Sequence, residues 1–313
     1  METTSQLDET RAFNAEVERM LAGTTSIHLL PPEVTRLARR EGRGVFPAPV
    51  VLPQARDITI PTRGGSIPAR VLTPESGTPT GIYLHIHGGG WTLGAHDMQD
   101  PLLWELVERT GMAAVSVGYR LAPEHPYPAG PDDCEDAALW LLRGGAGDLG
   151  APDRHAIGGE SAGAHLSAVT LLRLRDRHGI TGAFAAANLV YGAFDLSLTP
   201  SQRRWGDRYL VLSTPVIRWF ADQFLGDRDP EARRDPDVSP LYADLSAMPP
   251  ALFQVGTMDP LLDDSLFMEA RWRSAGGRTE LRVYDEAPHG FTAFGIDVAL
   301  AARHDQYEFL RTA

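Results

Sequence analysis

Short apolar runs alternate with helix-periodic segments through most of this 313-residue chain. An apolar run bounded by turn residues predicts a buried strand, and apolar residues three or four positions apart predict a helix. These rules place strands at 81–87, 113–119, 156–158, 188–192, 250–256 and 281–284, and helices at 102–109, 132–142 and 164–175. The alternation predicts an α/β fold with a mostly parallel sheet and helices on both faces.

Two regions depart from this alternation. Near the beginning of the chain, two amphipathic helical patterns lie at 8–21 and 32–40. Later, the strand pattern stops after the fourth run and a helical insertion follows, with its clearest periodicity at 214–225. The chain therefore divides into four segments, of which the second and fourth form the α/β core: 1–45, 46–194, 195–239 and 240–313.

A Gly-Glu-Ser-Ala-Gly string at 159–163 follows one predicted strand and precedes one predicted helix. Glycines on both sides of a serine permit a tight, strained turn that lifts the serine oxygen out of the backbone. This setting predicts that Ser161 is a nucleophile. The alternative is a turn serine that only caps the following helix.

A second glycine string, His-Gly-Gly-Gly-Trp at 87–91, ends another predicted strand. Its unencumbered backbone N–H groups suit a developing oxyanion, so we predict donors at Gly88 and Gly89, with Ala162 as the third. His87 is expected to bond the backbone and fix the loop, while the role of His85 stays open. Trp91 borders the loop and either shapes the substrate pocket or only packs.

The partners that a nucleophilic serine needs follow two later strands. Asp259 lies just past the predicted strand at 250–256, and His289 lies in the loop after the last strand. The order Ser, Asp, His along the chain, with each residue past a strand end, is the order of α/β hydrolases. Asp263 and Asp264 are competing acids, which we instead expect at the start of the next helix.

These strings, together with Tyr-Arg-Leu-Ala-Pro-Glu at 119–124 and Asp-Pro-Leu-Leu-Asp at 259–263, resemble the hormone-sensitive-lipase-like branch of the α/β hydrolases. This branch is called family IV among bacterial esterases, and the resemblance covers nearly the whole chain. Glu160 departs from it, since that family usually has Asp or Thr there. The resemblance implies an α/β-hydrolase fold with a Ser161–Asp259–His289 triad.

The resemblance also implies a helical cap over the site, built from 1–45 and 195–239. Aromatic residues of the inserted segment, Trp205 and Tyr209 among them, are candidates for substrate contact together with Trp91. The alternative is that these side chains form the core of the cap itself.

Composition narrows the chemistry further. The chain has no lysine, so all 29 basic residues are arginine, and a Schiff-base, pyridoxal-phosphate or Walker A lysine is excluded. A net charge of −12 disfavours nucleic acid and anionic membranes as partners. Cys134 has no partner for a disulfide, and no apolar run approaches the length of a membrane span. Without a signal-peptide pattern, we expect a cytoplasmic protein.

We therefore predict an enzyme that hydrolyses small carboxylic esters with short to medium chains through an acyl-enzyme intermediate. No cofactor or metal is expected, because His85 and His87 could share a face but no third ligand has suitable spacing. An amide or N-acetyl hydrolase and an aryl formamidase are alternatives that use the same triad. A ligand-binding protein without activity is a further alternative, against which His289 argues, and a homodimer stays open.

Overall fold

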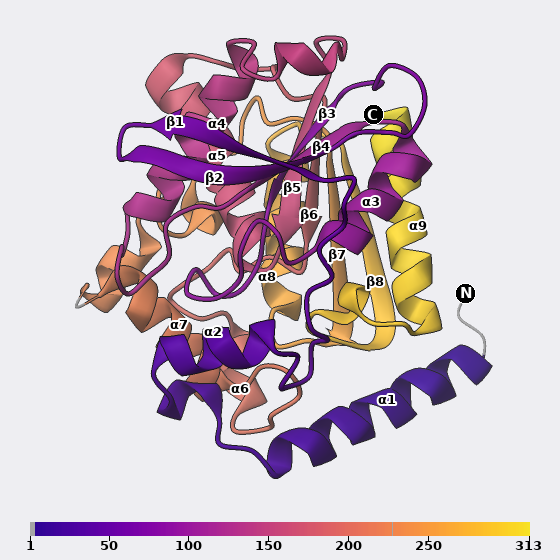
Figure 1. Ribbon diagram of the computed structural model, residues 1–313. Coiled ribbons are helices and arrows are strands. Elements are labelled where there is room, and N and C mark those ends of the chain that lie inside the picture. Colours follow the sequence, from indigo (N-terminus) through magenta and orange to yellow (C-terminus); the bar gives the residue numbers. More distant parts are fainter. Residues whose placement is uncertain (1–3, 227) are drawn as a thin grey trace.

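The computed structural model describes residues 4–226 and 228–313. Its centre is an eight-stranded sheet with the order β1-β2-β4-β3-β5-β6-β7-β8 (Figure 1). The strands are β1 (Arg56–Thr62), β2 (Gly65–Leu72), β3 (Ile82–Ile86), β4 (Ala113–Val117), β5 (His155–Glu160), β6 (Ala186–Val190), β7 (Ala251–Met258) and β8 (Thr279–Pro288). This arrangement is the α/β-hydrolase fold that the sequence predicts.

The sheet is parallel except around β2, which pairs antiparallel with both β1 and β4. From β4 to β8 every neighbouring pair is parallel. Strands β3, β4 and β6 are buried along their whole length, because helices cover both faces of the sheet. For this reason their sequences are continuous apolar runs and lack the alternation of apolar and polar residues typical of a half-exposed strand.

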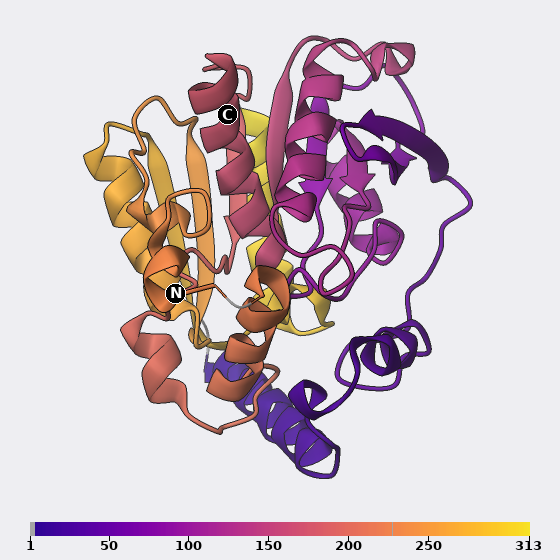
Figure 2. The same ribbon diagram turned by 90° about the vertical axis from the view of Figure 1, so that its left-hand side faces the viewer.

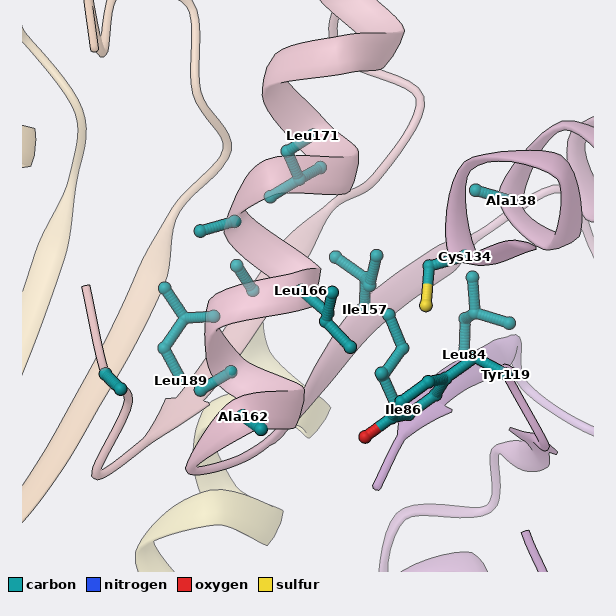
Figure 3. Close-up of a cluster of buried hydrophobic side chains, with 14 of the residues drawn as sticks. Leu84, Ile86, Tyr119, Cys134, Ala138, Ile157, Ala162, Leu166, Leu171 and Leu189 are labelled. Carbon is teal, nitrogen blue, oxygen red and sulfur yellow. The ribbon is translucent and has the colours of Figure 1, made fainter. Parts of the chain in front are cut away.

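Helices cover the two faces in separate layers. On one face α4 (Ala129–Leu142), α5 (Ala162–His178) and α8 (Leu262–Ser274) share a core with the strands. On the other face α3 (Asp100–Thr110) and α9 (Asp297–Thr312) pack against the sheet and against each other. Figure 3 shows part of the first core, where Leu166 of α5 lies beside Ile157 of β5, with Ile86 of β3 and Cys134 of α4 in the same cluster.

The remaining helices lie together at one end of the molecule, below the sheet in Figure 1 and again in Figure 2. They are α1 (Thr4–Ala22), α2 (Pro32–Arg40), α6 (Pro200–Trp205) and α7 (Thr214–Leu225). Elsewhere in the order of elements, 3-10 turns occur at Ile27–Leu29, Gly147–Leu149, Pro230–Arg234, Pro240–Tyr242 and Phe291–Ala293. Val17 and Leu21 of α1 pack on Leu210 of the inserted segment. The two segments expected to form a cap are thus in contact, although the exact domain boundaries stay a prediction.

Asp264 ties the inserted segment to the core. The residue lies in the first turn of α8, as expected, but its buried carboxylate also accepts bonds from the Phe194 and Asp195 N–H groups, from the Thr199 hydroxyl and from the Gln202 amide. Its role is therefore wider than that of a helix N-terminal acid. Among the described helices, none is long and apolar enough to cross a membrane.

Candidate active site

Ser161 sits at the turn between β5 and α5 with backbone angles that few side-chain-bearing residues adopt. Its φ is +57° and its ψ is −118°, a strained region for any residue except glycine. The Ser161 N–H donates to the Val190 carbonyl and the Ser161 carbonyl accepts from the His165 N–H. These bonds from β6 and α5 hold the strained turn and direct the hydroxyl away from the sheet.

The two glycines that flank Ser161, Gly159 and Gly163, are required because the turn approaches the end of β3 closely. A Cβ atom on Gly159 or on Gly163 would lie 1.9 Å from the carbonyl oxygen of Ile86 at the end of β3. No side chain tolerates that distance, so the turn can approach β3 only with glycine at both positions. The Gly-x-Ser-x-Gly spacing is thus a packing requirement of this sheet edge.

The structure brings Ser161, His289 and Asp259 together from three strand ends. His289 Nε2 is 3.0 Å from the Ser161 hydroxyl oxygen, and His289 Nδ1 is 2.8 Å from Asp259 Oδ2. Asp259 also accepts the Leu261 N–H at 2.8 Å, and its side chain is fully buried. With Nδ1–H donating to the carboxylate, Nε2 is left as an acceptor for the serine proton.

Tyr191, which the sequence did not single out, packs against the imidazole of His289. The two ring centroids are 4.9 Å apart in an edge-on arrangement. The Tyr191 hydroxyl is 2.6 Å from the Thr292 hydroxyl, which fixes the ring beside the loop that carries His289. This contact restricts the imidazole to the plane in which it meets both Ser161 and Asp259.

The Gly88 N–H, which the sequence predicts as an oxyanion donor, already has an acceptor in this structure. The Gly88 N–H donates to Glu160 Oε1 at 2.9 Å, so it is already engaged. By contrast, the N–H groups of Gly89, Gly90 and Ala162 have no acceptor among the described residues. Gly89 and Gly90 take φ values of +116° and +57°, which turn their N–H groups differently from that of Gly88. The free donors around Ser161 therefore include these three, whereas Gly88 is not among them.

Glu160 and His85 form a polar network beneath the glycine loop. Besides Gly88, the Glu160 carboxylate accepts from the Gln99 amide and from His85 Nε2, the latter at 3.1 Å. His85 Nδ1 in turn lies 2.9 Å from the Ser116 hydroxyl. Burial by itself raises the pKa of Glu160, but the interactions with His85, Gly88 and Gln99 outweigh it and hold that pKa below its ordinary value. An ionised carboxylate thus anchors the loop.

His87 fixes the loop as predicted, through the backbone. Its Nδ1 is 2.8 Å from the Gly88 carbonyl oxygen, and its ring stacks on Tyr119. Trp91 is buried, stacks on Phe224 and donates its indole N–H to His165 Nδ1 at 3.0 Å. Trp91 therefore packs behind the loop, where it also borders a small pocket beside Ser161.

A cavity of about 740 Å³ opens onto Ser161 and His289. It lies between the cap helices and the sheet and continues inward to Asn188 and Gln306. Tyr209 lines it, as predicted. Trp205 does not, since its indole N–H donates to the carbonyls of Arg208 and Leu212 within the cap. The volume is in the usual range for a small-molecule site.

No group of three or more His, Cys, Asp or Glu side chains among the described residues is arranged to hold a metal ion. The polar groups that line the cavity include the backbone of the glycine loop and the imidazole of His289. These groups are the ones needed to activate a hydroxyl and to stabilise an oxyanion.

Comparison with known proteins agrees with this geometry. Residues 83–293 match the family described as alpha/beta hydrolase fold. Carboxylic ester hydrolase LipN of Mycobacterium tuberculosis is 38% identical over 251 residues, which are 79% of this chain and 66% of that enzyme. Carboxylesterase NlhH of the same organism is 34% identical over 294 residues, with 91% of each chain covered.

Among solved structures, the hyperthermophilic esterase of Pyrobaculum calidifontis gives a TM-score of 0.86 at 30% identity, with 96% of this chain and 97% of that chain covered. An esterase of Pseudomonas putida gives a TM-score of 0.87 at 26% identity, covering 97% and 96% of the two chains. The chain belongs to the α/β-hydrolase family. Within that family it falls in the hormone-sensitive-lipase-like branch of carboxylic ester hydrolases.

Proposed function

We propose that this protein is a serine carboxylesterase that works through an acyl-enzyme intermediate. Ser161 attacks the ester carbonyl while His289 accepts its proton, and Asp259 stabilises the imidazolium that forms. His289 then protonates the departing alcohol, and a water molecule activated by the same imidazole releases the acid. The observation that carries this proposal is the continuous contact from Asp259 through His289 to the Ser161 hydroxyl.

For the oxyanion we propose the N–H groups of Gly89, Gly90 and Ala162. The three are free of acceptors among the described residues. Ala162 follows Ser161 in the chain, and Gly89 and Gly90 line the same cavity as Ser161. Glu160 contributes indirectly, because its bond to the Gly88 N–H holds the loop in the orientation that leaves the next two N–H groups available. Preorganised donors of this kind need no rearrangement when the negative charge develops.

Substitution of the nucleophile tests the mechanism. Ser161→Ala and His289→Ala are each expected to lower kcat for p-nitrophenyl acetate by on the order of a millionfold, and the double variant is expected to be hardly worse. A stopped-flow burst of p-nitrophenol from the wild type reports the acyl-enzyme directly. If Ser161→Ala in a carefully purified sample keeps more than a few per cent of the activity, the nucleophile is assigned wrongly.

The proposed preference is for short to medium acyl chains. The inner end of the cavity is polar: the Asn188 amide donates to the Tyr83 hydroxyl and to Gln306 Oε1, both at 3.4 Å. The side-chain oxygen of Asn188, Oδ1, is buried without a donor among the described residues. A long alkyl chain that reached this end would displace water from such groups without bonding them, which costs binding energy.

Initial rates with p-nitrophenyl esters from acetate to palmitate test this preference. We expect kcat/KM to rise while added methylenes are buried in the cavity and to fall once the chain reaches Asn188. The variant Asn188→Leu makes the inner end apolar and should move the maximum to longer chains. A maximum at palmitate in the wild type contradicts the proposed chain-length preference.

A further inference from the structure

Arg39 is a cation of the cavity that has no anionic partner in the part of the chain that the structure describes. It lies near the end of α2, is half-buried, and lines the same cavity as Ser161 and His289. Within residues 4–226 and 228–313, no carboxylate oxygen lies within 4.0 Å of its guanidinium, and none of its N–H groups donates a hydrogen bond. Its neighbour Arg40, by comparison, forms a bidentate pair with Asp97.

The other charged groups that line the cavity are already paired. Arg43 forms an ion pair with Glu41, and Arg303 lies 3.2 Å from a carboxylate oxygen of Glu105. Glu160 is the carboxylate that acts most strongly on Arg39 across the cavity, yet its two oxygens are taken by the donors of the loop network. Burial of Arg39, opposed only by such distant charge, lowers its pKa.

A half-buried cation without a counter-ion loses part of its hydration, and no ion pair within the fold offsets that loss. Stacking explains part of its position, because the guanidinium carbon lies 4.4 Å from the centroid of the Phe46 ring. That contact uses one face of the guanidinium and leaves its five edge N–H groups free. Those donors match a carboxylate or a similar planar anion in a bidentate pair.

The position of Phe46 places Arg39 relative to the reaction. A Cβ atom on Gly290 would lie 2.9 Å from Phe46 Cζ, so the ring packs directly against the residue after His289. A chain of contacts therefore runs from the residue after His289, Gly290, to the Phe46 ring and from that ring to Arg39. Since His289 delivers its proton to the departing oxygen, this is the side of the cavity where the alcohol portion of an ester lies.

We propose that Arg39 binds an anionic group on the alcohol portion of the ester, so that the substrates are esters of carboxylate-bearing alcohols or phenols. This inference rests on the proposed esterase function and adds the substrate class to it. Hydrolysis itself is unchanged: water adds across the ester bond, and the products are the acid and the anionic alcohol.

The test compares two acetate esters that differ in one charge, 4-acetoxybenzoate and its neutral analogue 4-acetoxybenzamide. The readout is the ratio of kcat/KM for the anionic ester to that for the neutral ester. Comparing this ratio between variants cancels the intrinsic difference in leaving group. Arg39→Gln should lower the ratio about 10- to 100-fold, the size of one charge-assisted bond. The matched control Arg40→Gln, on the same helix but outside the cavity, should leave the ratio as in the wild type.

Product inhibition of the wild type provides a measurement that does not depend on the folding of a variant. With p-nitrophenyl acetate as substrate, 4-hydroxybenzoate should inhibit competitively at least tenfold more strongly than 4-hydroxybenzamide. Equal inhibition by the two, or an Arg39→Gln variant that slows both esters equally, overturns the proposal for Arg39. Failure of the proposed function gives a different result, because 4-acetoxybenzamide then shows no hydrolysis that depends on Ser161.

Discussion

Acidification should destabilise this protein through His165, a histidine that the proposed reaction does not use. The residue is fully buried on α5. Its Nδ1 accepts the Trp91 indole N–H at 3.0 Å, and its Nε2 is 2.8 Å from the Val238 carbonyl oxygen, to which it donates. A second proton would have to bind Nδ1, where Trp91 already donates. Burial lowers the pKa of His165 to about 4, against the opposing effect of the Val238 bond.

The sign and size of the effect follow from this pKa. An unfolded histidine titrates near 6.5, so between pH 6.5 and 4 the unfolded chain binds more protons than the folded one. The contribution of His165 to the free energy of unfolding is therefore complete above pH 6.5, falls as the pH drops to 4, and stays constant below. Lowering the pKa from 6.5 to about 4 corresponds to about 3 kcal/mol of unfolding free energy. His87, whose pKa burial also lowers to about 4, should add a loss in the same window.

Urea unfolding at pH 7.5 and pH 4.5 measures the loss, with the wild type compared to His165→Gln. The free energy of unfolding of the wild type should fall by about 2–3 kcal/mol more between these pH values than that of the variant. His304→Gln, the same substitution at an exposed position of α9, is the control and should keep the wild-type difference. If His165→Gln loses as much stability on acidification as the wild type does, the account of His165 is refuted.

Three further predictions concern the cap, the loop and its anchor. Asp264→Ala leaves four donors without their acceptor. In urea unfolding it should lower the free energy of unfolding by about 3–5 kcal/mol, and the control Asp263→Ala should lower it far less. Gly90→Ala places a Cβ 2.2 Å from the Phe220 ring. The variant should lower kcat on the order of 100- to 1,000-fold with little change in KM. A change in KM alone contradicts the role of the Gly90 N–H as an oxyanion donor. Glu160→Gln should lower kcat while leaving the acetate-to-palmitate profile in place, and a changed profile would instead make Glu160 a substrate contact.

Much of the fold follows from local pattern, for a reason visible in β3 and β5. Strands covered on both faces must be apolar throughout, so Ile82–Ile86 stands out against its neighbours in the sequence. Ser161 and Asp259 were found because each follows such a run, whereas His289 was found because it lies in the loop after the last strand, β8, which is partly exposed. The helix at Asp297–Thr312 was not predicted, since its buried positions include polar residues such as Gln306 and Arg303. Helical periodicity is obscured where a helix carries polar groups into a cavity.

The site residues that sequence reasoning missed or misplaced depend on contacts between distant segments. Trp205 and Tyr209 are both aromatic residues of the inserted segment, and the sequence does not separate them. Tyr209 lines the cavity, whereas Trp205 does not, because its indole N–H donates to a carbonyl within the cap. Arg39 is one of several arginines in a polar stretch. That it has no anionic partner among the described residues becomes visible only in the folded structure. Nothing in the local sequence distinguishes these cases.

Gly88 and Glu160 show how one such contact changes the chemistry of a motif. Three successive glycines offer equivalent N–H groups in the sequence, and the first two were expected to bind the oxyanion. The carboxylate next to the nucleophile takes the first of them, together with His85 and Gln99. A threonine at this position has no carboxylate, and an aspartate is one methylene shorter, so neither can span all three donors in this geometry. The glutamate thus shifts the free donors by one residue along the loop, to Gly89 and Gly90, while it holds them in place.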